Sequence, residues 1–193
     1  MSLRLSILNA LVPVSKAVGK MHAPFSHKEV TGKHVYDIEP HLGPGMVLLS
    51  YIRGEVSNLA IPGEFTHAAM VVSDKEVIEA SGAGVQKKDL ITFMTSKDRV
   101  ALLHPKFCGA VHMSLALKYA EGCLGAPYDF VFTPGNKAFY CSELIQHAYE
   151  QTTAPGTKVI FTRRTSLGIA TVLPVDFYLA KEKWALVWDS KKV

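Results

Sequence analysis

A broken run of apolar residues near the middle of the chain limits most strongly what this sequence can fold into. Residues 65–72 are almost wholly apolar, which predicts a strand buried on both faces. Three polar residues, 73–75, interrupt the run, and an extended pattern resumes over 76–80. Two such segments joined by a short polar break predict a β-hairpin. A further apolar run over 46–52 follows a Gly-Pro-Gly sequence and predicts another buried strand.

The hairpin carries one histidine and one carboxylate among apolar neighbours. His67 lies in the first strand and Glu79 in the second. A turn centred on Ser73 would place the two directly opposite each other, whereas a turn centred on Asp74 and Lys75 would offset them by three residues. A buried carboxylate needs a partner, and beside His67 it would orient the ring and stabilise the protonated form. The alternative is a solvent-facing glutamate and a histidine satisfied within the core.

A cysteine stands where a second helix is expected to begin. Residues 110–122 and 139–149 have the apolar spacing of helices. Cys141 shares a stripe with the apolar residues at i+3, i+4 and i+7, so its thiol points toward whatever this helix packs against. Unpaired N–H groups and the positive dipole end at a helix start lower a thiol pKa and favour the nucleophilic thiolate. The alternative is a buried structural thiol. Cys108 and Cys123 lack this setting.

The N-terminal region offers two further candidate features. Apolar residues at helical spacing over residues 3–20 indicate a helix packed on the domain or, as the alternative, one in weak contact with a membrane surface or a partner. The following segment is expected to be a loop that contains His22, His27, His34 and His41. These histidines lack H-x-x-x-H and H-E-x-x-H spacing, so we expect no metal there, with a histidine metal protein as the alternative.

Arginines and a final apolar run mark the C-terminal region. Arg163 and Arg164 lie in the segment 151–174 after the cysteine helix, where they would suit an anionic substrate group. The alternative for this segment is a surface hairpin. Residues 184–188 predict a last strand.

Composition and length exclude several classes of protein. The chain has 193 residues, which predicts one domain over 1–193. Within it we expect an N-terminal helix and loop extension over 1–42, a core over 43–150 that carries the candidate residues, and a C-terminal loop and strand over 151–193. A net charge of +4 without a dense basic run predicts no nucleic-acid partner. Three cysteines without a C-x-x-C pair exclude a disulfide scaffold and favour a reduced, cytoplasmic setting. We expect neither a cofactor, nor a cleavable signal, nor a transmembrane helix, which needs ~20 apolar residues.

The order of these segments resembles the circularly permuted branch of the NlpC/P60 papain-like superfamily, the YiiX-like group. The histidine hairpin precedes the cysteine helix, which reverses the order of ordinary NlpC/P60 enzymes, and the twelve-residue gap from His67 to Glu79 matches the superfamily's spacing. The resemblance covers about residues 43 to 150. It rests on I-P-G-E-F-T-H-A-A-M-V-V (61–72), V-I-E-A (77–80), G-A-P-Y-D-F (125–130) and F-Y-C-S-E-L-I (139–145).

This resemblance implies an α+β, papain-like fold with a small antiparallel sheet or open barrel packed on the cysteine helix. It implies that Cys141 is the nucleophile, His67 the general base and Glu79 the orienting residue, in place of the histidine often found there. The implied function is a cysteine-dependent hydrolase or acyltransferase that acts on an amide or ester bond of a cell-wall-type peptide or a lipid/acyl substrate. Tyr140 and Tyr51 are candidate substrate-binding residues and secondary donors. The alternative is a non-catalytic lipid- or acyl-binding protein on the same fold.

Overall fold

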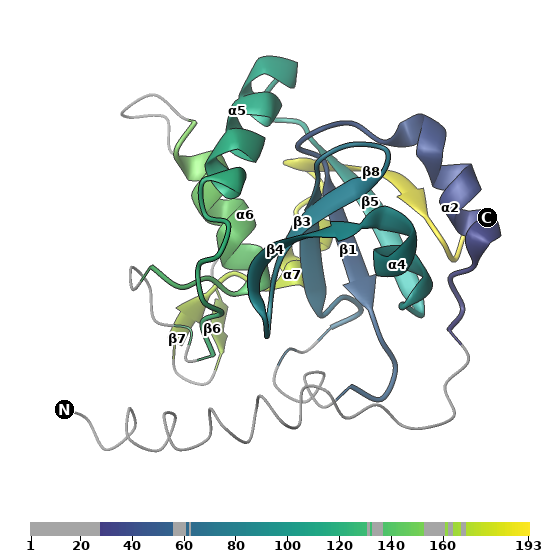
Figure 1. Ribbon diagram of the computed structural model, residues 1–193, viewed down its shortest axis with the longest axis horizontal. Helices are drawn as coiled ribbons and strands as arrows, with labels where there is room; N and C mark the ends of the chain where they lie inside the picture. The colour runs from purple at the N-terminus through teal and green to yellow at the C-terminus, as the bar shows by residue number, and fades with distance from the viewer. Residues whose placement is uncertain are drawn as a thin grey trace.

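An open, six-stranded antiparallel sheet forms the centre of the protein, with the strand order β4-β3-β2-β1-β5-β8 (Figure 1). The computed structural model describes residues 28–55, 61, 63–130, 132, 137–152, 161, 164–166 and 169–193. The strands of the sheet are β1 (Val47–Tyr51), β2 (His67–Val71), β3 (Glu76–Ser81), β4 (Gly84–Asp89), β5 (Arg99–Pro105) and β8 (Trp184–Asp189). This mixture of helices and antiparallel sheet is the α+β fold that the sequence predicts, with the sheet open rather than closed into a barrel.

Helices cover both faces of the sheet, with α5 and α6 on one side and α2 and α4 on the other (Figure 1). The α-helices are α2 (Gly32–Ile38), α4 (Leu90–Thr95), α5 (Ala110–Glu121), α6 (Cys141–Glu150) and α7 (Pro174–Leu179). The remaining elements are the 3-10 helix η1 (Glu39–His41) and the paired short strands β6 (Arg164–Ser166) and β7 (Ile169–Thr171). In the described ranges, no helix is long and apolar enough to cross a membrane.

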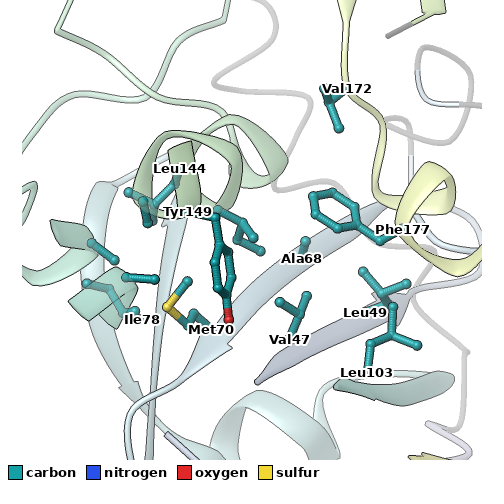
Figure 2. Packing of buried hydrophobic residues seen from close by; sticks show 14 of the residues in the cluster. Val47, Leu49, Ala68, Met70, Ile78, Leu103, Leu144, Tyr149, Val172 and Phe177 are labelled. Carbon is teal, nitrogen blue, oxygen red and sulfur yellow. The ribbon is translucent and has the colours of Figure 1, made fainter. Parts of the chain in front are cut away.

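Alternate residues of the central strands enter two separate cores. Ala68 and Met70 of β2 pack beneath α6, where Tyr149 lies over them (Figure 2). Ala69 and Val71 enter the opposite core, beneath α2 and α4. Because side chains alternate along a strand, only a nearly continuous apolar run can supply both cores. This confirms that residues 65–72 contain a strand buried on both faces.

The hairpin of β2 and β3 has a register that neither sequence alternative gave. Glu79 lies opposite Ala69, so it is offset from His67 by two residues. The backbone N–H groups of Val72 and Ser73 both donate to the carbonyl oxygen of Glu76, at 2.9 and 3.2 Å, which closes a three-residue turn. An even offset keeps His67 and Glu79 on one face of the sheet, as diagonal neighbours within reach of long side chains.

Two of the histidines expected in a loop lie in helices instead. His34 belongs to α2 and His41 to η1. The Thr31 N–H and the His34 Nδ1 are 3.0 Å apart, so the histidine caps the start of its own helix, while Ile38 is buried beneath it. A seven-residue helix is too short to give a clear apolar period, which is why the sequence did not reveal it. The predicted helix over residues 3–20, His22 and His27 lie outside the described residues.

The longer predicted elements are confirmed. The helix expected over 110–122 is α5, the helix expected over 139–149 is α6, and the strand expected over 184–188 is β8. The apolar stripe of α6 that begins with Cys141 is buried along its length. Strand β8 pairs with β5, so the C-terminal region adds a strand to the sheet that holds β2 and β3.

A buried arginine ties the beginning of β2 to the far edge of the sheet. Arg99 donates through Nε and Nη2 to the two carboxylate oxygens of Asp189, at 3.1 and 2.7 Å, and through Nη1 to Glu64 at 2.7 Å. Its guanidinium also lies 4.6 Å from the ring centroid of Phe65. Phe65 precedes His67 by two residues, so this cluster fixes the segment that carries the histidine.

Removal of one partner of this arginine is expected to destabilise the fold. Asp189→Ala should lower the free energy of unfolding by about 3 kcal/mol, because it leaves Arg99, a residue that is only 6% exposed, without its two-oxygen partner. Urea unfolding measures the change. Lys33→Ala removes an exposed ion pair on α2 and should cost less than about 0.5 kcal/mol. Equal losses in the two variants would contradict the role given to Arg99.

Candidate active site

Strands β2 and β3 bring His67 and Glu79 together on the face of the sheet that α4 covers. His67 Nε2–H donates to Glu79 Oε2 at 2.7 Å. Glu79 is only 3% exposed, while 19% of the His67 side chain is open to solvent. Burial raises the pKa of Glu79, but the hydrogen bond and charge of His67, followed by the charges of Lys97 and Lys88, lower it to about 2. Glu79 is therefore a carboxylate at any ordinary pH.

Helix α6 places the Cys141 sulfur at the end of the β2–β3 ladder. That ladder begins at Ala69, and the backbone N–H of Ala68, outside it, donates to the sulfur. The backbone N–H of Ser142, in the first turn of α6, donates to it as well. Tyr140 is extended and serves as the N-cap, so the helix begins at the cysteine itself. The sulfur therefore lies where free N–H groups and the helix dipole stabilise negative charge.

A hydrogen bond joins the Cys141 thiol to the His67 ring. Because Nε2 is bonded to Glu79, Nδ1 is the ring nitrogen left for the sulfur. Burial raises the pKa of the Cys141 thiol, but the contact with His67 and the N–H groups of Ala68 and Ser142 lower it below its ordinary value. Burial likewise lowers the pKa of His67, but Cys141 and Glu79 raise it to about 9. The lowered pKa of the thiol and the raised pKa of the ring together favour a thiolate–imidazolium pair.

The two candidate tyrosines do not join this cluster through their hydroxyl groups. The Tyr140 hydroxyl accepts hydrogen bonds from Thr171 Oγ1 at 2.8 Å and from the Val172 N–H at 3.3 Å, at the end of β7. Tyr51 follows Ser50, the strand partner of His67, so alternation along β1 directs its side chain to the opposite face of the sheet from His67.

The remaining candidates are placed only in part. Arg164 lies in β6, but its side chain and the whole of Arg163 fall outside the described residues. Cys108 and Cys123 are half-buried, and burial raises the pKa of each thiol. Of the three cysteines, Cys141 is therefore the one whose surroundings favour the thiolate form.

The sequence interpretation missed one aromatic residue and two cations. Tyr128 forms a bridge with Phe139 just before α6, and burial and the negative charge of Cys141 raise its pKa. Lys88 Nζ lies 3.9 Å from Glu79 Oε1. Lys97 is 7% exposed, and its charge also acts on Glu79. Tyr128 lies in the G-A-P-Y-D-F segment, which is one of the segments that carry the family resemblance. Nothing in the sequence distinguishes the two lysines from others.

The cluster has three donor types that bind metals elsewhere, but its geometry does not suit a metal ion. Within the described ranges, no group of three or more His, Cys, Asp and Glu side chains is arranged to hold one. Glu79 and Cys141 bond to different nitrogens of His67, so the three side chains are arranged along the ring rather than around a common point.

The geometry predicts that Cys141 reacts with iodoacetamide at a pH where ordinary thiols, with a pKa of ~8.5, are protonated. Near pH 6, peptide mass spectrometry should find Cys141 alkylated at least about tenfold faster than Cys108 or Cys123. Glu79→Gln should slow this reaction, because it removes the carboxylate that stabilises the imidazolium. Equal labelling of the three cysteines at pH 6 would contradict the assigned thiolate.

Comparisons with known proteins identify the family and confirm the papain-like fold. The sequence profile of a family described as permuted papain-like amidase enzyme, YaeF/YiiX, C92 family, matches residues 41–188. Among solved structures, the chain is similar to one described as metalloprotein YiiX from Escherichia coli O157:H7, with a TM-score of 0.63 and 19% identity over 75% of this chain and 96% of that one. The curated proteins contain no match. The chain, with its hairpin histidine ahead of its helix-start cysteine, belongs to the YaeF/YiiX (C92) family of permuted papain-like amidase enzymes.

Proposed function

We propose that this protein is a cysteine hydrolase that cleaves an amide bond through an acyl-enzyme on Cys141. The observation that carries the proposal is the position of the His67 ring, which is bonded to Cys141 on one side and to Glu79 on the other. A nucleophile, a base and a group that orients the base are the minimum set for nucleophilic acyl transfer. Membership of an amidase family supports amide substrates over esters.

The acylation step uses the proton that His67 already holds. The Cys141 thiolate attacks the carbonyl carbon, a C–S bond forms, and the carbonyl oxygen becomes an oxyanion. Imidazolium Nδ1 then gives its proton to the leaving nitrogen as the C–N bond breaks, which yields a thioester and an amine. Glu79 holds Nε2 throughout, so the ring keeps its orientation while its charge changes.

In deacylation His67 takes up a proton instead of giving one. Neutral His67 takes a proton from a water molecule, whose oxygen attacks the thioester carbon. Collapse of this second intermediate breaks the C–S bond, releases a carboxylic acid and restores the thiolate–imidazolium pair. An acceptor alcohol or amine in place of water would make the same site an acyltransferase, which is the second form of the proposal.

We assign two donors to the oxyanion. The backbone N–H of Cys141 lies in the first turn of α6 and has no partner within the helix. Tyr128 is the second donor in this proposal. Burial and the negative charge of Cys141 raise the pKa of its hydroxyl, so the hydroxyl stays protonated. A phenol in this place donates a hydrogen bond and carries no competing charge.

A small peptide or an acyl-bearing lipid remains the proposed substrate class. Neither a metal nor a nucleic acid has a part in the proposed chemistry. The similar YiiX structure is described as that of a metalloprotein, but the donor geometry in the described part of this chain does not fit a metal and no step uses one. The membrane contact proposed for residues 3–20 would serve an acyl-lipid substrate.

The first test measures turnover of a peptide p-nitroanilide library. Cys141→Ala should abolish release of p-nitroaniline, and Glu79→Gln should lower kcat by at least about tenfold, because the ring loses its fixed orientation. Circular dichroism controls for folding. A wild-type protein that binds acyl ligands without turnover, and keeps this binding in Cys141→Ala, would support the non-catalytic alternative and contradict the proposal.

The second test concerns the oxyanion. Tyr128→Phe should lower kcat by about 10- to 100-fold with little change in KM, because the lost hydrogen bond forms only as the oxyanion develops. Tyr140→Phe is the matched control. The Tyr140 hydroxyl accepts hydrogen bonds from Thr171 and Val172, so its removal should lower stability rather than kcat. Equal kcat losses in both variants would contradict the role of Tyr128.

A further inference from the structure

A lysine extends the His67–Glu79 pair onto a third strand. In the β3–β4 ladder Glu79 lies opposite Gln86, so Lys88 is its diagonal neighbour on the same face. Lys88 Nζ lies 3.9 Å from Glu79 Oε1, while the other carboxylate oxygen, Oε2, accepts from His67 at 2.7 Å. Each oxygen of the carboxylate therefore has its own cationic partner whenever the histidine is protonated.

A second lysine also acts on this carboxylate. Lys97 lies between α4 and β5, and only 7% of it is exposed. Its Nζ lies 4.9 Å from the ring centroid of Phe93, and this ring lies 6.1 Å from the ring of His67. Its charge acts on Glu79 more strongly than that of Lys88 does. Burial lowers the pKa of Lys97. The charges of Glu79 and Glu55 act against this shift, and those of Lys88 and Lys28 add to it.

The proposed reaction explains why a buried carboxylate in this place needs cationic neighbours besides His67. While His67 is an imidazolium, it compensates Glu79. After His67 gives its proton to the leaving group, Glu79 would be a buried, unpaired carboxylate, which is costly. Such a carboxylate holds the imidazolium proton tightly, and the histidine then acts poorly both as the acid in acylation and as the base in deacylation. A neutral histidine or asparagine in the place of Glu79 would not create this penalty.

We propose that Lys88 and Lys97 are positioning residues that share the negative charge of Glu79, so that it remains a carboxylate while His67 is neutral. This inference rests on the proposed function, because only a catalytic cycle requires His67 to change its charge in place. It adds two residues, from β4 and from the α4–β5 turn, that act on the reaction through Glu79 alone.

The test measures the pKa of His67 by NMR with labelled histidine, in a Cys141→Ala background that removes the thiolate. The His67 signal is assigned by its loss in His67→Gln. Lys88→Met and Lys97→Met should each raise the pKa of His67 by about half a unit or more, because each leaves the deprotonated ring beside a less compensated carboxylate. Lys88→Arg keeps the charge and should restore the original value.

Lys87→Met is the matched control. Lys87 is the neighbour of Lys88 on β4, points to the other face, and pairs with Glu121 of α5 at 2.7 Å. Its loss should leave the pKa of His67 unchanged. With Cys141 present, Lys88→Met should also move the rise of the deacylation rate with pH to higher pH by the same interval as the pKa. A purely structural role would lower the melting temperature without moving either titration.

An unchanged or lowered pKa of His67 in folded Lys88→Met protein would overturn the inference. Lys88 lies on an edge strand and its side chain is 31% exposed, so this variant decides the matter even if Lys97→Met does not fold. The titration needs no substrate. If the pKa rises as expected but the native protein cleaves no amide, the charge sharing is supported and the proposed hydrolase function is contradicted. If amides are cleaved and the pKa does not rise, the hydrolase function is supported and the charge sharing is contradicted.

Discussion

The hydrogen bond between His67 and Glu79 is the interaction on which the site depends. It joins two strands of one hairpin, fixes the tautomer of the ring and leaves Nδ1 for the sulfur of Cys141. Its strength comes from burial, since a carboxylate that is 3% exposed has little water to compete for it. The same burial would make the carboxylate unstable by itself, so the imidazolium and the carboxylate require each other.

Cys141, the third member of the site, meets this pair at the end of the β2–β3 ladder rather than in a loop. The β2–β3 ladder stops at Ala69, which leaves the Ala68 N–H free to bond the sulfur at the start of α6. Helix α6 packs on the face of the sheet that Met70 and Ala68 enter. This packing positions Cys141, which contacts His67 at the end of the ladder although His67 lies on the opposite face. The Arg99 cluster then fixes the segment from which β2 begins.

Local signals in the sequence were enough for the main elements. They made His67, Glu79 and Cys141 candidates but left alternatives open, and the family resemblance supplied their roles. The apolar run over 65–72 and the stripe that starts at Cys141 each depend on near neighbours in the chain, so both could be interpreted without a fold. The offset of Glu79 could not, because it depends on which backbone groups close a three-residue turn. Lys87 and Lys88 are the same residue type side by side, and only the pairing of β4 with β3 decides which one meets Glu79. Arg99 and Asp189 are 90 residues apart in the sequence, so no local pattern predicts their pairing.

The most direct test of the account is the charge on the Cys141 sulfur in the resting protein. Thiolate ultraviolet absorbance, taken as the difference between the native protein and Cys141→Ala across a pH titration, measures it without substrate or reagent. The account predicts that the thiolate signal persists well below pH ~8.5, the pKa of an ordinary thiol, and that His67→Gln removes this low-pH signal. A signal that appears only as the pH rises through ~8.5 would contradict the thiolate–imidazolium pair.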